Sequence, residues 1–113
     1  HWHFHGPDPE LNNRMHQAFK AHCFHQMLPL AMPTKLTRHG FVGAHCTPMG
    51  FLNNSLHHNS FAYLASKLFT HFAEGHGIPK EDVQRWREQL DEAERDGRFG
   101  FVSVPVLTTA IAV

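Results

Sequence analysis

Hydrophobic side chains recur every three or four positions in three stretches of the chain, the spacing that places them on one face of an α-helix. A capping residue or a proline opens each stretch, and a glycine ends two of them. A shorter helix through residues 35–38 is expected to end at Gly40, after Pro29 and Pro33 break the chain. The pattern therefore predicts three longer amphipathic helices, over residues 9–25, 60–75 and 79–97.

Two further stretches, residues 41–47 and 99–113, are rich in β-branched and aromatic side chains and are predicted to be strands. Pro105 lacks a backbone donor and implies a bulge or a sheet edge there. The polar residues 53–59 are expected to form a loop. Two strands cannot form an independent sheet, so the chain is expected to need more strands.

We expect residues 41–47 and 99–110 to pair antiparallel, because each segment is apolar and each follows a helix that a glycine ends. One edge of this pair would then expose unpaired backbone groups, which recruit another strand. The extended segment from Trp2 to His5 is the best candidate for that strand. A homodimer or strand exchange through the open edge is therefore expected.

Composition narrows the class of protein. Hydrophobic residues make up 42% of the 113 residues and charged residues 18%, as in a globular protein. Lys plus Arg and Asp plus Glu both number 10, so no basic surplus indicates a nucleic-acid partner. The sequence shows neither a membrane-spanning apolar run nor a signal peptide. Cys23 and Cys46 lack disulfide or CxxC spacing, and reduced thiols predict a cytoplasmic protein.

Three stretches carry a resemblance to a known family. Trp2 precedes Asp8-Pro9, and Leu36-Thr-Arg-His-Gly-Phe41 leads into a strand. Residues 82–90 and 96–103 then give a tryptophan-bearing helix, a glycine turn and an aromatic-rich last strand. In this order the chain resembles the C-terminal half of class I S-adenosylmethionine-dependent methyltransferases, in the group similar to the ubiquinone/menaquinone-biosynthesis and arsenite methyltransferases. Residues 104–106, Val-Pro-Val, depart from the Asn-Arg-Tyr that many relatives carry.

The resemblance implies an α/β fold: residues 1–113 would be the C-terminal part of a Rossmann-like sheet, with its last two antiparallel strands and capping helices. The residues between them, 53–97, would be a helical insertion that covers the active site. The half that binds S-adenosylmethionine, with its Gly-rich turn, is absent from this sequence, so no cofactor-binding residue is assigned. The complete protein would transfer a methyl group to a small organic acceptor, and this chain alone would be inactive.

The resemblance also implies where the acceptor binds. The N-terminal segment is expected to enter the mouth of the pocket and the insertion to cover it, while no catalytic residue is identified. In-line methyl transfer requires mainly positioning and exclusion of water, which an apolar, phenylalanine-rich covering provides. The candidate acceptor-binding residues are Trp2, Phe4, His5, His57, His58 and Phe61.

Two alternatives to the methyltransferase remain open, and the first of them rests on the 12 histidines. His1, His3 and His5 would face one way in an extended segment and, with the terminal amine, could bind a transition metal. No Cys, Asp or Glu completes a recognised spacing, so no metal site is predicted. A His-rich metal-binding module and a non-catalytic assembly domain remain the alternatives to the methyltransferase.

Overall fold

The computed structural model describes residues 2–113, and these form a mixed α/β fold with four helices and two small antiparallel sheets. No helix among them is both long and apolar enough to cross a membrane. The elements follow one another as β1 (Trp2–Phe4), α1 (Pro9–His22), α2 (Leu28–Arg38), β2 (Phe41–Pro48), β3 (Phe51–Asn53), α3 (Phe61–Gly75), α4 (Lys80–Arg95), β4 (Phe101–Ser103) and β5 (Val106–Ala112).

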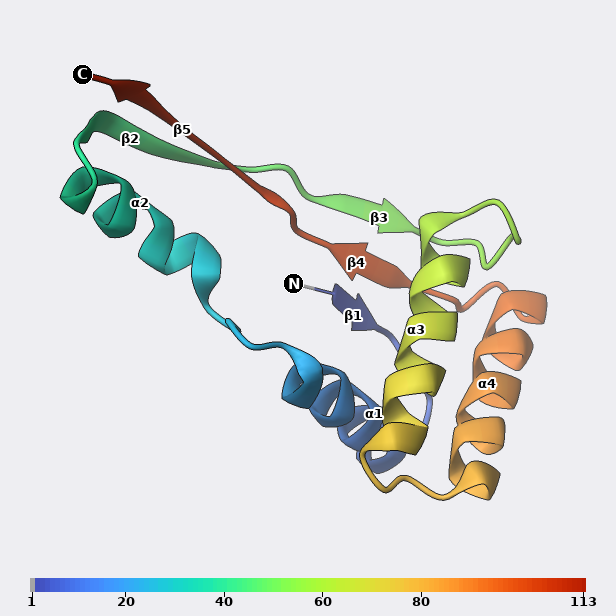
Figure 1. The fold of residues 1–113 in the computed structure, drawn as a ribbon. Helices are drawn as coiled ribbons and strands as arrows, with labels where there is room; N and C mark the ends of the chain where they lie inside the picture. Colours follow the sequence, from blue (N-terminus) through green and yellow to red (C-terminus); the bar gives the residue numbers. More distant parts are fainter. Residues whose placement is uncertain (1) are drawn as a thin grey trace.

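The chain has two parts (Figure 1). The body consists of α1, α3 and α4 packed on the three-stranded sheet β1-β4-β3, and the arm consists of α2 with the two-stranded sheet β2-β5. The molecule measures 52 × 30 × 22 Å and its radius of gyration is 16.9 Å. A compact domain of this length would have a radius of gyration of about 13 Å, so the arm projects well beyond the body.

The predicted antiparallel pairing is confirmed for β2 and β5, whose register runs from Phe41 opposite Ala112 to Pro48 opposite Val106. The predicted last strand is divided into β4 and β5, because Val104 and Pro105 interrupt the ladder. The N–H of Met49 still donates to the carbonyl of Pro105 at 2.8 Å across this break. Beyond it β4 pairs with β3, a short strand that the sequence pattern did not predict.

The hydrophobic core lies entirely in the body. α3 contributes small residues and Phe69, which lets the helix approach α1 closely, while α4 contributes Trp86 from the middle of its apolar face. The helical spacing of Trp86 with Val83 and Leu90 predicts that its ring is buried, and this is confirmed, since Trp86 is 0% exposed. The largest fully buried side chains are Trp86, Phe4, Phe69, Phe101, Leu11, Met15 and Leu90.

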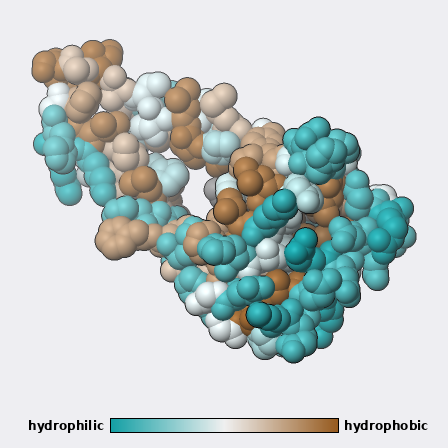
Figure 2. Space-filling model, turned by 45° about the vertical axis from the view of Figure 1, so that its right-hand side comes forward, coloured by the Kyte–Doolittle hydropathy of each residue, from teal (hydrophilic) through white to brown (hydrophobic). Residues whose placement is uncertain are grey.

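The arm has no fully buried residue in α2, β2 or β5. α2 packs on one face of the β2-β5 ribbon, with the Cys46 thiol 3.8 Å from the carbonyl of Pro29. The opposite face is bare: Leu107 is 51% exposed and Ile111 66%. Hydrophobic side chains show on this part of the molecule in Figure 2. The arm therefore resembles part of a larger sheet whose second face is covered in the complete domain.

The predicted end of α1 and the predicted start of α2 are wrong. α1 ends at His22 because Cys23 takes an extended conformation and donates its N–H back to the carbonyl of Lys20. α2 begins at Leu28, well before the predicted residues 35–38. Pro29 is tolerated because it lies in the first turn, where no helical donor is lost. Pro33 is accommodated inside the helix.

The segment predicted as a strand for exchange, Trp2 to His5, pairs within its own chain. Trp2 lies opposite Ser103 and Phe4 opposite Phe101 in the antiparallel β1-β4 ladder. The outer side of β1 is covered by α1, because Nε2 of His16 accepts the N–H of Phe4 at 2.9 Å and Asn12 Nδ2 donates to the Phe4 carbonyl at 2.9 Å. In this structure β1 is therefore not free to pair with a partner.

Candidate functional site

Aromatic rings from four elements of the body meet on the surface around Trp2. The Trp2 ring stacks on Phe19 of α1 with centroids 5.0 Å apart, and Phe61 of α3 stands perpendicular to it at 5.2 Å. Phe51 of β3 meets Phe61 at 5.6 Å, and Phe72 of α3 meets Phe19 at 6.2 Å. These five rings, Trp2, Phe19, Phe51, Phe61 and Phe72, are called the aromatic face below.

The aromatic face remains accessible although it borders the core. Phe61 is 37% exposed and Phe51 38%, and Trp2 is half-buried. The N-terminal end of β1, which carries Trp2, lies on the side of the body nearest the arm (Figure 1). The molecule is hollowed between body and arm, with hydrophobic side chains on both sides of the hollow (Figure 2). Aromatic surface of this kind binds flat apolar groups by stacking and edge contacts.

The sequence of α3 explains why this surface exists. Its core side is formed by alanines and Phe69, at positions 62, 65, 69 and 73. A second apolar row, next to the first on the helix surface, contains Phe61, Leu64, Leu68 and Phe72 at spacings of three or four residues. Leu64 in this row is 52% exposed. α3 therefore carries more apolar surface than the body buries.

His22 adds a polar group beside the aromatic face. Its ring stacks on Phe72 at 3.7 Å between centroids, and its Nδ1 hydrogen-bonds the carbonyl of Phe19. A carbonyl can only accept, so Nδ1 carries a hydrogen, and in the neutral ring Nε2 keeps a lone pair. The Cys23 thiol lies 3.9 Å from Nε2. The arrangement can accept a proton from a hydroxyl group bound against the aromatic rings.

The structure brings together two of the predicted acceptor-binding residues, Trp2 and Phe61. Phe4 lies beneath them and is 0% exposed, with its ring 4.6 Å from that of Phe101, so the structure gives it a packing role. His5 lies in a separate cleft along α1. His57 and His58 contact each other at 4.4 Å in an exposed loop before α3, and the structure shows neither in contact with the aromatic face.

Sequence reasoning missed Phe19, Phe51, Phe72 and His22. Phe19 and Phe72 follow the helical spacing of core residues, so nothing in the pattern separates them from Leu11 or Phe69. Phe51 lies in the strand that was not predicted. His22 lies near a helix C-terminus, where a cation suits the helix dipole, so the sequence pattern predicts an exposed residue there. One feature of the sequence indicated such a surface. The apolar stripe on α3 is wider than the single row of residues that a helix needs to pack against a core.

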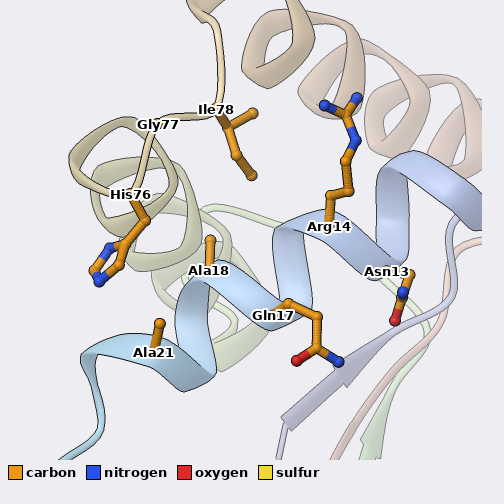
Figure 3. A pocket seen from close by; sticks show the side chains of 8 residues that line it. All are labelled: Asn13, Arg14, Gln17, Ala18, Ala21, His76, Gly77 and Ile78. Atoms are coloured by element: carbon orange, nitrogen blue, oxygen red, sulfur yellow. The ribbon is translucent and has the colours of Figure 1, made fainter.

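A second depression lies between α1 and the turn from α3 to α4 (Figure 3). It has a volume of about 460 Å³, and its polar groups do not converge. Arg14 extends away from it towards α4, where its guanidinium pairs with Asp82 at 2.8 Å (Figure 3). Ala18, Ala21 and Ile78 supply apolar wall. This depression has no pair of groups suited to acid–base or nucleophilic chemistry.

No group of three His, Cys, Asp or Glu side chains within residues 2–113 is arranged to hold a metal ion. The proposed clamp that includes His1 and the terminal amine lies outside the described residues. His3 and His5 lie on one strand end, and the nearest imidazole is His16, whose ring is 4.7 Å from that of His3. Both nitrogens of His16 already have hydrogen-bond partners in the protein.

The described residues do not fit S-adenosylmethionine. That cofactor needs a Gly-rich turn between a strand and a helix, and an acidic side chain for the ribose hydroxyls. The turn from β1 to α1 has one glycine, and its Asp8 caps the helix by accepting the N–H of Leu11 at 3.2 Å. Comparisons of the chain with known protein families, with curated proteins and with solved structures find no match.

Proposed function

We propose that this chain is the acceptor-covering, C-terminal part of an S-adenosylmethionine-dependent methyltransferase. The observation that carries the proposal is the antiparallel pairing of β2 with β5 across an insertion that contains α3 and α4. The resemblance in the sequence implies this connection for the last two strands of such a sheet. Here the insertion also carries two rings of the aromatic face, Phe61 and Phe72 of α3.

The exposed face and the unpaired strand edges of the arm support the same proposal. α2 covers one face of the β2-β5 ribbon and leaves Val42, Leu107 and Ile111 exposed on the other. In doubly wound sheets helices cover both faces, and the remaining strands extend the edge. Within residues 2–113, β2 and β5 pair only with each other. A cofactor-binding half would supply both the missing strands and the second helical layer.

The aromatic face fits the chemistry required of the covering part. Methyl transfer from a sulfonium is an in-line displacement, so the acceptor atom must be aligned and water kept away. Trp2 and Phe61, set at 82° to each other, form a corner that fixes the plane of a flat acceptor. His22 packs against Phe19 and Phe72 of the aromatic face, and we propose that its neutral ring takes the proton of an acceptor hydroxyl. We therefore propose flat, hydroxylated organic acceptors.

The test is an activity assay on this chain together with the cofactor-binding half that the proposal requires. Methyl transfer to a panel of phenols, quinols and aliphatic acids would be measured by mass spectrometry. Phe61→Ala is expected to lower kcat/KM for a flat acceptor roughly tenfold, through loss of one aromatic contact and apolar area. Phe24→Ala is the matched control, because Phe24 is 92% exposed in the linker after α1.

Two results would contradict the proposal. One is the absence of methyl transfer to every class of acceptor by a completed protein that binds the cofactor. The other is an equal loss of activity in Phe61→Ala and Phe24→Ala, which would remove the aromatic face from acceptor binding. Reading the sequence upstream of residue 1 is a cheaper first step, since a strand followed by a Gly-rich turn is required there.

A further inference from the structure

A cleft of about 410 Å³ runs between β1 and α1 on the outer side of β1, and it shares Asn13 and Gln17 with the second depression. α1 contributes one row of residues along its surface, and β1 contributes its first two residues, followed by the turn to α1. It is called the histidine cleft below. Its lining consists of Trp2, His3, His5, Gly6, Pro9, Asn12, Asn13, His16, Gln17 and Lys20.

Basic side chains line the histidine cleft, and no acidic side chain does. Lys20 and three imidazoles line it, and no Asp or Glu does. Asp8 and Glu10 flank Pro9 in the sequence, but neither lines the cleft. The Asp8 carboxylate accepts the N–H of Leu11 at 3.2 Å and lies 3.8 Å from Arg85 of α4. The amides of Asn13 and Gln17 add neutral donors. In a chain of zero formal net charge, this separation of charge creates one electropositive concavity.

His16 fixes the shape of the cleft and does not need to change its protonation. Its Nε2 accepts the N–H of Phe4 at 2.9 Å, and its Nδ1 donates to the carbonyl of Asn12 at 2.6 Å. These bonds hold β1 against α1, which places the exposed His3 beside it with ring centroids 4.7 Å apart. Burial lowers the pKa of His16, and the neighbouring His3 and Lys20 add to that effect.

We propose that the histidine cleft binds a small anion, a carboxylate or phosphate group, through His3, His5 and Lys20. An imidazole ring can donate a hydrogen bond to an anion, and its protonated form is a cationic donor. Hydrogen bonds from charged donors to an anion are stronger than neutral ones. The cleft shares Trp2 with the aromatic face. The three side chains proposed to bind the anion are not part of the aromatic face, so variants of these residues test the anion site separately from methyl transfer.

The test titrates the 113-residue chain with inorganic phosphate and, separately, with acetate, at constant ionic strength and at about pH 6 and about pH 8. Histidine side-chain and Lys20 signals are followed by NMR. We expect saturable binding at one site, about tenfold tighter at the lower pH, which corresponds to one additional charge-assisted hydrogen bond. Tighter binding of one probe identifies the preferred anion.

His3→Gln, His5→Gln and Lys20→Met are the test variants, and all three residues are exposed, so folding is expected to be retained. His71→Gln is the matched control, because His71 is an exposed histidine on α3 that does not line the cleft. Each test variant should weaken binding and the control should not. Non-saturable shifts, equal affinity at both pH values, or the same loss in His71→Gln would overturn the proposal.

Discussion

Trp86 of α4 donates its Nε1–H to Oδ1 of Asn12 in α1 at 3.0 Å, and both side chains are buried. The Nδ2 of the same Asn12 donates to the carbonyl of Phe4 at 2.9 Å. One amide therefore ties α4, α1 and β1 together. It also satisfies the only hydrogen-bonding group of the largest core side chain. The position of β1, and hence of Trp2 on the aromatic face, depends on this bond.

Asn12→Ala is expected to destabilise the chain by about 2–4 kcal/mol, because it leaves two buried polar groups without partners and opens a small cavity. The measurement is urea unfolding followed by circular dichroism. Asn13→Ala is the control, since Asn13 is the exposed neighbour on the same helix, and it should change stability by less than about 0.5 kcal/mol. Equal effects of the two variants would show that the buried amide does not stabilise the fold.

Trp86→Ala is expected to cost about 3–5 kcal/mol, as for other large-to-small core changes. Combined with Asn12→Ala, the loss should be smaller than the sum of the two single losses, because both variants break one shared hydrogen bond. Unfolding measurements on the two single variants and the double variant give the coupling. A loss below about 1 kcal/mol for Trp86→Ala would show that the ring is exposed in solution.

Gly6→Ala should be destabilising for a steric reason. A Cβ at Gly6 would lie 2.6 Å from Oδ1 of Asn12, which is already bonded to Trp86. We expect a loss of about 1–3 kcal/mol, measured by thermal unfolding. At Gly75 a Cβ would meet nothing within 4 Å, so Gly75→Ala is the matched control and should be neutral or mildly stabilising. The reverse order would contradict the close approach of Asn12 to the β1–α1 turn.

His16 makes stability depend on pH in a defined direction. Burial lowers its pKa in the folded state below the ordinary value, so the unfolded chain binds the proton more readily. Its contribution is therefore complete above about pH 6.5 and is lost as the pH falls through the folded-state pKa. Protonation at Nε2 would also break the hydrogen bond from the N–H of Phe4.

The measurement compares unfolding of the wild type and of His16→Gln from about pH 8 down to about pH 5. The stability difference between them should shrink as the pH falls. Gln17→Ala serves as the control, because Gln17 is the exposed, non-titratable neighbour of His16 on α1, and its difference from the wild type should change little with pH. A stability difference for His16→Gln that grows on acidification would contradict the neutral, hydrogen-bonded imidazole.

The bare face of the arm predicts self-association when the chain is studied alone. Leu107 and Ile111 lie on that face, beside strand edges that have no partner within residues 2–113. Light scattering should detect a dimer, and Leu107→Lys with Ile111→Lys should shift it to monomer. Gln84→Lys on the exposed side of α4 should leave the dimer unchanged. A monomer at every concentration would contradict the prediction.

Local signals predicted much of this fold. Asp8 and Ser60 cap α1 and α3 through their side chains, and Gly97 follows α4 with φ +71°, as the sequence indicated. Pairing of β2 with β5 followed from two apolar strands that needed a partner. β3 was not predictable, because Phe51–Asn53 has no alternating pattern and is a strand only through its pairing with β4.

The candidate site was less predictable than the fold. Trp2 and Phe61 were predicted to bind the acceptor and lie together on the aromatic face. Phe4 was predicted on the same grounds, as an aromatic residue two positions after Trp2 on one strand, but it lies in the core. The difference between them is set by α4, whose Trp86 ring covers Phe4 at 5.2 Å and leaves the Trp2 end of the strand open. Such a difference depends on tertiary packing, and no pattern within residues 2–5 contains it.

Calorimetric titration with S-adenosylmethionine tests the central claim most directly. The 113-residue chain alone is predicted not to bind it, because no described turn or acidic side chain fits the methionine end or the ribose. The same chain joined to a cofactor-binding half is predicted to bind one equivalent. Micromolar binding at one site by the chain alone, or no binding by the completed protein, would contradict the account.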